Sequence, residues 1–160
     1  MKHRKDKFLL GVFLGILMVT MAVLSGCGAK AEPKPDPGSG KYLIYYLNSS
    51  LTKLVAQEYE TETKDQADLA EELMGQLLHV PRDLDCQPAV NEKVSFKTCR
   101  IDEQVLYLYF DGSYISMKPE QEILCRAALA RTMTQIPGID YISIYRGDQP
   151  LMDRQGNPVG

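Results

Sequence analysis

The chain has 160 residues, 44% of them hydrophobic and 24% charged, a composition typical of a folded protein with one main domain. It carries 18 Lys and Arg against 21 Asp and Glu, so its formal net charge is −3. Binding to nucleic acid usually requires a basic surface, and this acidic balance argues against a nucleic-acid partner.

The first 26 residues have the pattern of a bacterial signal peptide. A basic segment from Lys2 to Lys7 precedes an apolar run from Phe8 to Leu24. The run leads through Leu-Ser-Gly to Cys27, which resembles the lipobox of bacterial lipoproteins. This resemblance implies cleavage between Gly26 and Cys27 and transfer of a diacylglyceryl group, with acyl chains such as palmitate, to the nucleophilic thiol of Cys27. The alternative is an uncleaved anchor, because roughly 17 apolar residues approach the length that spans a bilayer.

Residues 27–40 predict a tether that begins at the lipidated Cys27. Its three prolines favour an extended chain, and its Gly-Ser-Gly end favours a flexible one. The first 26 residues hold four of the Lys and Arg and one of the acidic residues, so the remaining chain has a net charge of −6. Anionic lipid headgroups repel such a chain. We therefore expect the covalent lipid to hold it at the extracytoplasmic face of the membrane.

Residues 41–160 predict one folded domain. Strand patterns rich in β-branched and aromatic residues occur at Tyr42–Leu47, Val94–Ile101, Val105–Phe110 and Tyr141–Tyr145, with an additional edge strand at Leu54–Glu62. The segments on either side of Asp102-Glu103-Gln104 predict a β-hairpin. A change in the apolar phase of the first hairpin arm predicts a bulge near Thr98.

Two helices separate these strands. Thr63 and Gln66 have the spacing of a capping box, and apolar residues follow at helical spacing until Pro81 ends the pattern. The second helix begins at Pro119, which suits a first turn, and ends before Pro137-Gly138. The order β-(β)-α-β-β-α-β predicts an α+β domain with one largely antiparallel sheet and both helices packed on one of its faces.

Tyrosines gather on the other face of the predicted sheet. Strand alternation places Leu106, Leu108, Ile142 and Ile144 toward the helices, and it places Tyr107, Tyr109, Tyr141 and Tyr145 on the opposite side. Tyrosine suits any half-exposed sheet surface, which is the simplest explanation. The alternative is a surface that docks a protein, because tyrosine combines a large apolar area with a polar tip.

Four segments of the domain resemble one known family. They are Tyr42–Leu47, the helix end at Leu77–Pro81, the turn Asp111–Tyr114, and the stretch Ala130–Ile144. Together they resemble the GerMN domain of extracytoplasmic lipoproteins linked to sporulation and spore germination, here in a single copy. The matching motifs are folding patterns, so the resemblance implies a non-catalytic domain.

The residues that could carry chemistry point the same way. No metal-site spacing occurs among Cys86, Cys99, Cys125 and His79. Sequence alone does not decide whether Cys86 and Cys99 form a disulfide. Cys125 shares a helical stripe with apolar residues, which predicts a buried thiol. No nucleotide-binding or hydrolase motif is present in the sequence, so we expect no enzyme, no metal and no cofactor other than the lipid on Cys27.

Two functions remain open. The first is a non-catalytic module of the cell envelope that docks onto an envelope protein or onto a second copy of itself. The second is a lipoprotein that binds a small ligand or a cell-wall glycan. A flat tyrosine surface favours docking, whereas a concave pocket lined by tyrosines and a few polar groups favours the ligand.

Overall fold

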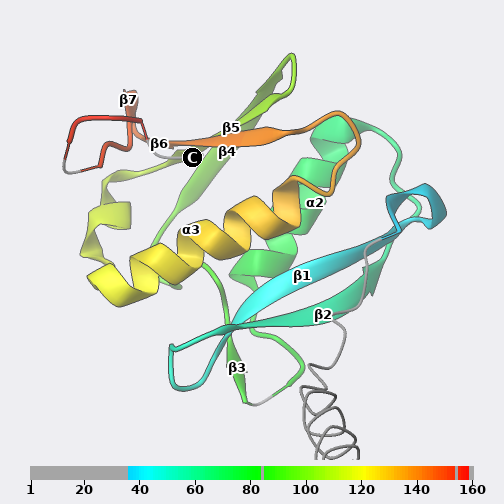
Figure 1. Ribbon diagram of the computed structural model, residues 1–160, viewed down its shortest axis with the longest axis horizontal. Coiled ribbons are helices and arrows are strands. Elements are labelled where there is room, and N and C mark those ends of the chain that lie inside the picture. The colour runs from blue at the N-terminus through cyan, green and yellow to red at the C-terminus, as the bar shows by residue number, and fades with distance from the viewer. Residues whose placement is uncertain (1–35, 84, 154, 159–160) are drawn as a thin grey trace, which may run out of the picture. The chain divides into compact units, whose positions relative to one another are not determined.

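The computed structural model describes residues 36–83, 85–153 and 155–158 (Figure 1). The predicted signal peptide, Cys27 and the first part of the tether lie outside these residues. In chain order the elements are η1 (Pro37–Ser39), β1 (Lys41–Asn48), β2 (Leu54–Glu60), α2 (Gln66–Leu78), β3 (Cys86–Gln87), β4 (Phe96–Asp102), β5 (Val105–Phe110), η2 (Gly112–Ser116), α3 (Pro119–Met133), β6 (Tyr141–Arg146) and β7 (Gln149–Pro150). The predicted α+β class is confirmed, and the predicted elements occur in the predicted order; the two-residue strands β3 and β7 were not predicted.

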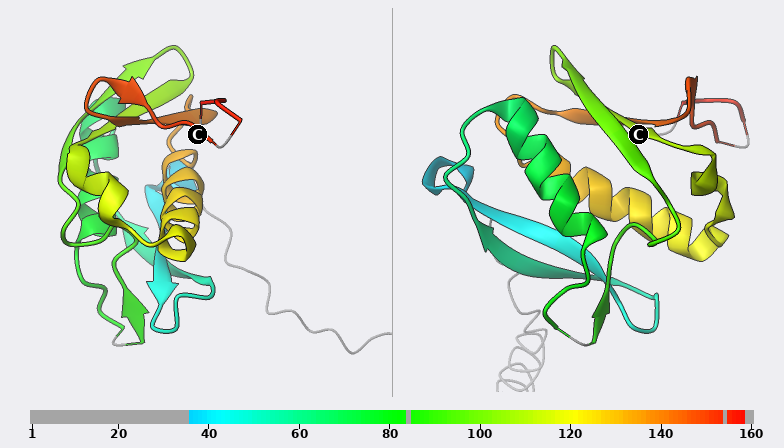
Figure 2. Two further views of the ribbon diagram at one scale, coloured as in Figure 1. Left: turned by 90° about the vertical axis from the view of Figure 1, so that its left-hand side faces the viewer. Right: turned by 180° about the vertical axis from the view of Figure 1, so that it is seen from behind.

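The strands form two sheets, and the prediction of a single sheet is wrong on this point. One sheet has the order β2-β1-β3 and the other the order β4-β5-β6-β7. All pairs are antiparallel except β5 with β6, which run parallel. Both helices contact both sheets, and Figures 1 and 2 show them between the β1–β2 pair and the β5–β6 pair. Local sequence patterns predict strands but carry no information on which strands pair across the chain.

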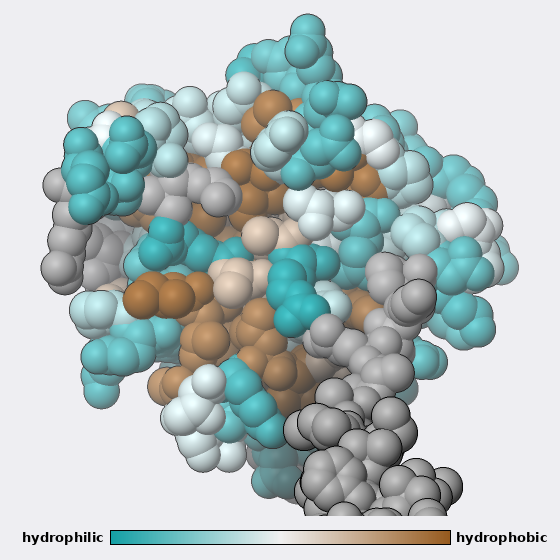
Figure 3. All heavy atoms as spheres, in the orientation of Figure 1, coloured by the Kyte–Doolittle hydropathy of each residue, from teal (hydrophilic) through white to brown (hydrophobic). Residues whose placement is uncertain are grey.

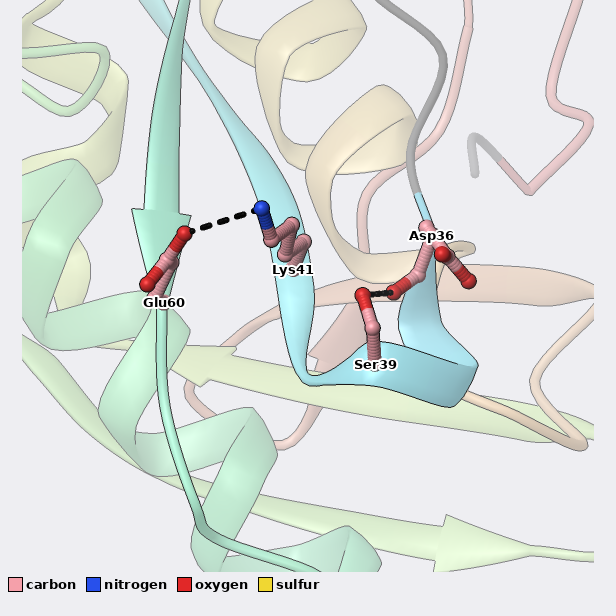
Figure 4. Close-up of polar contacts among 4 residues, drawn as sticks. All are labelled: Asp36, Ser39, Lys41 and Glu60. Carbon is pink, nitrogen blue, oxygen red and sulfur yellow. Dashed lines mark hydrogen bonds and ion pairs between the residues drawn. The ribbon is translucent and has the colours of Figure 1, made fainter.

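The first strand pair begins at a tight turn that includes residues expected to belong to the tether. Gly40 has a φ of 76°, and a Cβ at this position would lie 2.3 Å from the carbonyl oxygen of Thr61. Ser39 donates to the carbonyl of Asp36 at 3.0 Å, and Lys41 forms an exposed ion pair with Glu60 at 3.2 Å (Figure 4). Residues 36–40 therefore lead directly into β1 as a defined turn.

The start of α2 differs from the predicted capping box. The N-cap is Asp65, whose carboxylate accepts the backbone N–H groups of Ala67 and Asp68 at 2.9 and 3.1 Å. Thr63 lies two residues before this N-cap, and its hydroxyl donates to Glu72 at 2.6 Å. The end of α2 lies where Pro81 predicted it, with His79 as the C-cap residue.

The hairpin and the second helix follow the prediction closely. The pairing of β4 with β5 shifts between Phe96 and Thr98, which confirms the bulge. Glu103 takes a φ of 53° in the hairpin turn, so a residue other than glycine adopts the left-handed conformation there. Pro119 occupies the first turn of α3, as predicted.

Helix α3 and the turn after it close the second edge of β1. From Tyr42 to Leu47, β1 is buried, and its inner edge pairs with β3 only at Leu47 and Asn48. Along the rest of this edge the side-chain amide of Gln135 accepts from the N–H of Leu43 and donates to its carbonyl, both at 2.8 Å. Thr132, fully buried, accepts from the N–H of Tyr45 at 3.2 Å. These two side chains take the place of a neighbouring strand, because buried backbone groups require hydrogen-bond partners.

A second polar link joins β2 to α2 at Glu72. The hydroxyls of Tyr59 and Thr63 each donate to its carboxylate at 2.6 Å. Burial alone would raise the pKa of Glu72, but hydrogen bonds from Thr63, Tyr59 and Thr61 outweigh this effect and lower the pKa below the ordinary 4.5. The same interaction raises the pKa of Tyr59 to about 12.

We expect Gln135→Ala to lower the free energy of unfolding by about 1–3 kcal/mol, because it removes both partners of the Leu43 backbone in a buried strand. Chemical denaturation monitored by circular dichroism measures this change. Gln104→Ala, at an exposed side chain in the hairpin turn, is the matched control and should leave stability unchanged. Equal stability of the two variants would contradict the role given to Gln135.

We expect Glu72→Gln to lower the free energy of unfolding at neutral pH by about 1 kcal/mol, through loss of charge-assisted hydrogen bonds. Since the folded-state pKa of Glu72 is lowered, its contribution is present above pH 4.5 and is lost as the pH falls through the folded-state pKa. The difference between the two proteins should therefore vanish in acid. Denaturation curves at a series of pH values, with exposed Glu71→Gln as control, test this; a difference independent of pH would refute it.

Candidate functional site

The tyrosines predicted to share one face do so in the structure. Along β5 and β6, Leu106, Leu108, Phe110, Ile142 and Ile144 are buried. The alternate residues Tyr107, Tyr109 and Tyr145 are partly exposed, and Tyr141 is 65% exposed. We call the surface formed by these four tyrosines the tyrosine face. It lies on the side of the second sheet opposite to the buried leucines and isoleucines.

Strand register arranges this face in three rows that cross the sheet. The first row is Asp102, Val105 and Tyr141; the second is Arg100, Tyr107 and Ser143; the third is Thr98, Tyr109 and Tyr145. Residues opposite one another in neighbouring strands project to the same side of the sheet, so each row presents its side chains together. The face is therefore built from β4 as well as from the two strands that carry the tyrosines.

The aromatic rings of the face contact one another. The ring centroids of Tyr109 and Tyr145 are 5.0 Å apart, and those of Tyr107 and Tyr145 are 6.0 Å apart in an edge-to-face arrangement. These distances are typical of favourable aromatic pairs. The three rings thus form a connected aromatic cluster.

Arg100 also belongs to this surface, and the sequence did not predict its place there. Its guanidinium lies 4.9 Å from the ring centroid of Tyr107, within the range of a cation–π contact. It also approaches the carboxylate of Asp102 at 3.8 Å, and both side chains are more than half exposed. Alternation along β4 could have placed Arg100 beside the tyrosines, had the hairpin register been known.

Two cavities lie elsewhere in the described part of the chain, and none of the four tyrosines lines either. The first, of about 400 Å³, lies along β1, β2 and the end of α2, and Tyr46, Tyr59, Gln57, Gln76, His79 and Arg82 are among its lining residues. The second, of about 510 Å³, lies between η2, α3 and the C-terminal segment, with Ile123 and Met152 at its rim. Figure 3 shows apolar residues, in brown, over α3 and the neighbouring part of β1.

The three thiols of the domain are free. Cys86, Cys99 and Cys125 form no disulfide, so the bond between Cys86 and Cys99 that sequence alone left open is not made. Cys125 is fully buried, as predicted, and burial raises its pKa to about 12. A thiol in that state is a poor nucleophile. Burial also raises the pKa of Cys86 and Cys99.

The described residues contain neither a candidate metal site nor a helix that could span a membrane. Within them no group of three His, Cys, Asp or Glu side chains could hold a metal ion. The ring of His79 is bound to the carbonyl of Gly75 at the end of α2. Over the same ranges no helix has the length and apolar character needed to cross a membrane.

The fold matches known proteins. Two solved structures from Bacillus subtilis are similar: the first GerMN domain of the sporulation protein GerM, and the tandem GerMN domains of the same protein. The first has a TM-score of 0.60 at 16% identity and covers 75% of this chain and 93% of that one. The second has a TM-score of 0.59 at 16% identity and covers 75% of this chain and 44% of that one. No curated protein sequence matches.

A family model described as "Germane: Sporulation and spore germination" matches residues 43–152. This range runs from the third residue of β1 to the second residue after β7. Apart from Tyr42, it includes the four segments in which the GerMN resemblance was found. The predicted resemblance is confirmed, and the likeness to the GerM domains extends it to the fold. The chain belongs to the Germane family, linked to sporulation and spore germination.

Proposed function

We propose that this protein is a lipoprotein held at the extracytoplasmic face of the membrane, where its GerMN-like domain acts as a non-catalytic module that docks onto an envelope protein in sporulation or spore germination. The family supplies the link to sporulation and germination. The tyrosine face, exposed on one sheet and separate from both cavities, is the observation that supports docking.

The lipid anchor is supported by the order of segments at the N-terminus. A basic segment, an apolar run and Leu-Ser-Gly-Cys follow one another over residues 2–27, and a Pro-rich stretch separates them from the first turn of the domain. The chain after residue 26 has a net charge of −6, so anionic lipid headgroups repel it. Membrane attachment therefore depends on the lipid of Cys27.

Docking is supported by the composition and position of the tyrosine face. Interfaces are enriched in Tyr and Arg, and the face combines four tyrosines with Arg100. Tyr107, Tyr109 and Tyr145 are held by contacts with one another, so a partner would order few new side chains on binding. Neither the family nor the fold supplies a catalytic group at this surface.

A second function has one observation in its favour. The cavity of about 400 Å³ is lined by two tyrosines, Tyr46 and Tyr59, with several amide and charged side chains. Such a mixture suits a small polar ligand or a cell-wall glycan. Co-sedimentation of the protein with purified cell wall measures this alternative directly, with a Tyr59→Phe variant to test the role of the cavity.

We expect Cys27→Ser to abolish stable membrane association, because lipid transfer requires the thiol. Membrane fractionation with a detergent step, followed by immunoblotting, shows where the variant lies. Thr20→Ser, within the apolar run and outside the lipobox, is a control for general effects on export. An uncleaved Cys27→Ser chain that resists extraction as well as the native protein would instead identify residues 8–24 as the anchor.

We expect Tyr107→Ala and Tyr145→Ala each to weaken partner binding by about 1–3 kcal/mol, the range typical of tyrosines at the centre of an interface, while sparing the fold. Affinity capture of the full chain from membranes of sporulating cells, compared with thermal unfolding of the same variants, measures both effects. Ile123→Ala removes an exposed apolar side chain on α3 and is the matched control. Unimpaired capture by well-folded tyrosine variants would remove the tyrosine face from consideration.

A further inference from the structure

The tyrosine face is complementary to itself. Of the residues in its three rows, Arg100 alone is cationic and Asp102 alone is anionic, and they occupy adjacent rows on the same strand. Their mutual contact is long, at 3.8 Å, and their side chains are 59% and 58% exposed. A pair so exposed contributes little to the stability of the fold, so both groups remain available to another molecule.

Consider a two-fold axis that runs parallel to the rows, midway between the first and the second. It places the first row of one copy over the second row of the other copy. Asp102 then lies over Arg100 of the second copy, which pairs opposite charges twice. Val105 lies over the second copy's Tyr107, and Ser143 lies over its Tyr141, so Tyr107 and Tyr141 each meet a smaller side chain. Two-fold interfaces have this property in general, because every contact between unlike residues occurs twice.

The overall charge of the protein favours this surface for contact between copies. The chain after residue 26 carries a net charge of −6, so two copies repel one another at most orientations. The tyrosine face has no net charge, since Arg100 balances Asp102. It is also the place where exposed aromatic area is concentrated, with Tyr141 65% exposed.

We propose that the tyrosine face docks onto the same face of a second copy of this chain, about a two-fold axis that pairs Arg100 of each copy with Asp102 of the other. This rests on the proposed function, and it identifies the partner of the face as a second copy. If both copies are anchored in one membrane, their restricted positions raise the effective concentration and favour even a weak contact.

Charge reversal tests the pairing. Arg100→Asp gives a face with two acidic groups, and Asp102→Arg gives a face with two basic groups. We expect each variant to capture a copy of itself at least about tenfold less well than the native chain does, because like charges are then opposed twice. A mixture of the two variants restores both opposite pairs, and so does the double variant, so we expect capture in these cases to return to within about twofold of native.

The measurement is co-capture of two differently tagged full-length chains from membranes, with thermal unfolding as a check on each variant. Lys41→Glu reverses a charge in the exposed ion pair with Glu60 on the other sheet, and it should leave capture unchanged. Absence of self-capture by the native chain, no effect of single reversal, or failure of the mixture to recover would each overturn the proposal. In those cases the native chain could still capture a different protein. If Tyr107→Ala then lost that protein, docking by the tyrosine face would remain supported.

Discussion

The amide of Gln135 and the hydroxyl of Thr132 hold the backbone of β1, and much of the remaining structure depends on this contact. β1 is buried from Tyr42 to Leu47, so the backbone groups on its second edge cannot reach water. A further strand would satisfy them, but the chain uses one side chain from the C-terminal end of α3 and one from the turn that follows it. Because these bonds are directional, they orient α3 along β1, as Figure 1 shows.

The division into two sheets follows from this arrangement. With α3 along most of one edge of β1 and β2 along the other, the hairpin of β4 and β5 has no free edge of β1 to join. It pairs instead with β6, which returns from α3 and runs parallel to β5. The helices then cover one face of this second sheet, and its other face carries the tyrosines. The exposed surface proposed for docking is thus a consequence of how β1 is closed.

Local patterns in the sequence were sufficient to predict most helices and strands, but not to predict how these elements pack and pair. β5 and β6 were predicted within one residue because alternation of large side chains is a local signal, and Pro119 and Pro81 marked helix boundaries for steric reasons. The capping box failed because Thr63 and Asp65 are both residue types that cap helices, and α2 begins directly after Asp65. The strand Cys86–Gln87 is too short to produce a pattern. The roles of Gln135 and Arg100 depend on neighbours far along the chain, which periodicity does not reveal.

The distance along the chain between β1 and its cover also matters for folding. Leu43 and Gln135 are separated by 92 residues. Synthesis proceeds from the N-terminus, so the Tyr-Leu-Ile-Tyr-Tyr-Leu segment is made long before the side chain that satisfies its backbone. During that interval an apolar, aromatic strand has an open edge, which is the feature that promotes pairing between chains and aggregation. Until α3 is complete, β1 therefore keeps an edge that can pair with the wrong strand.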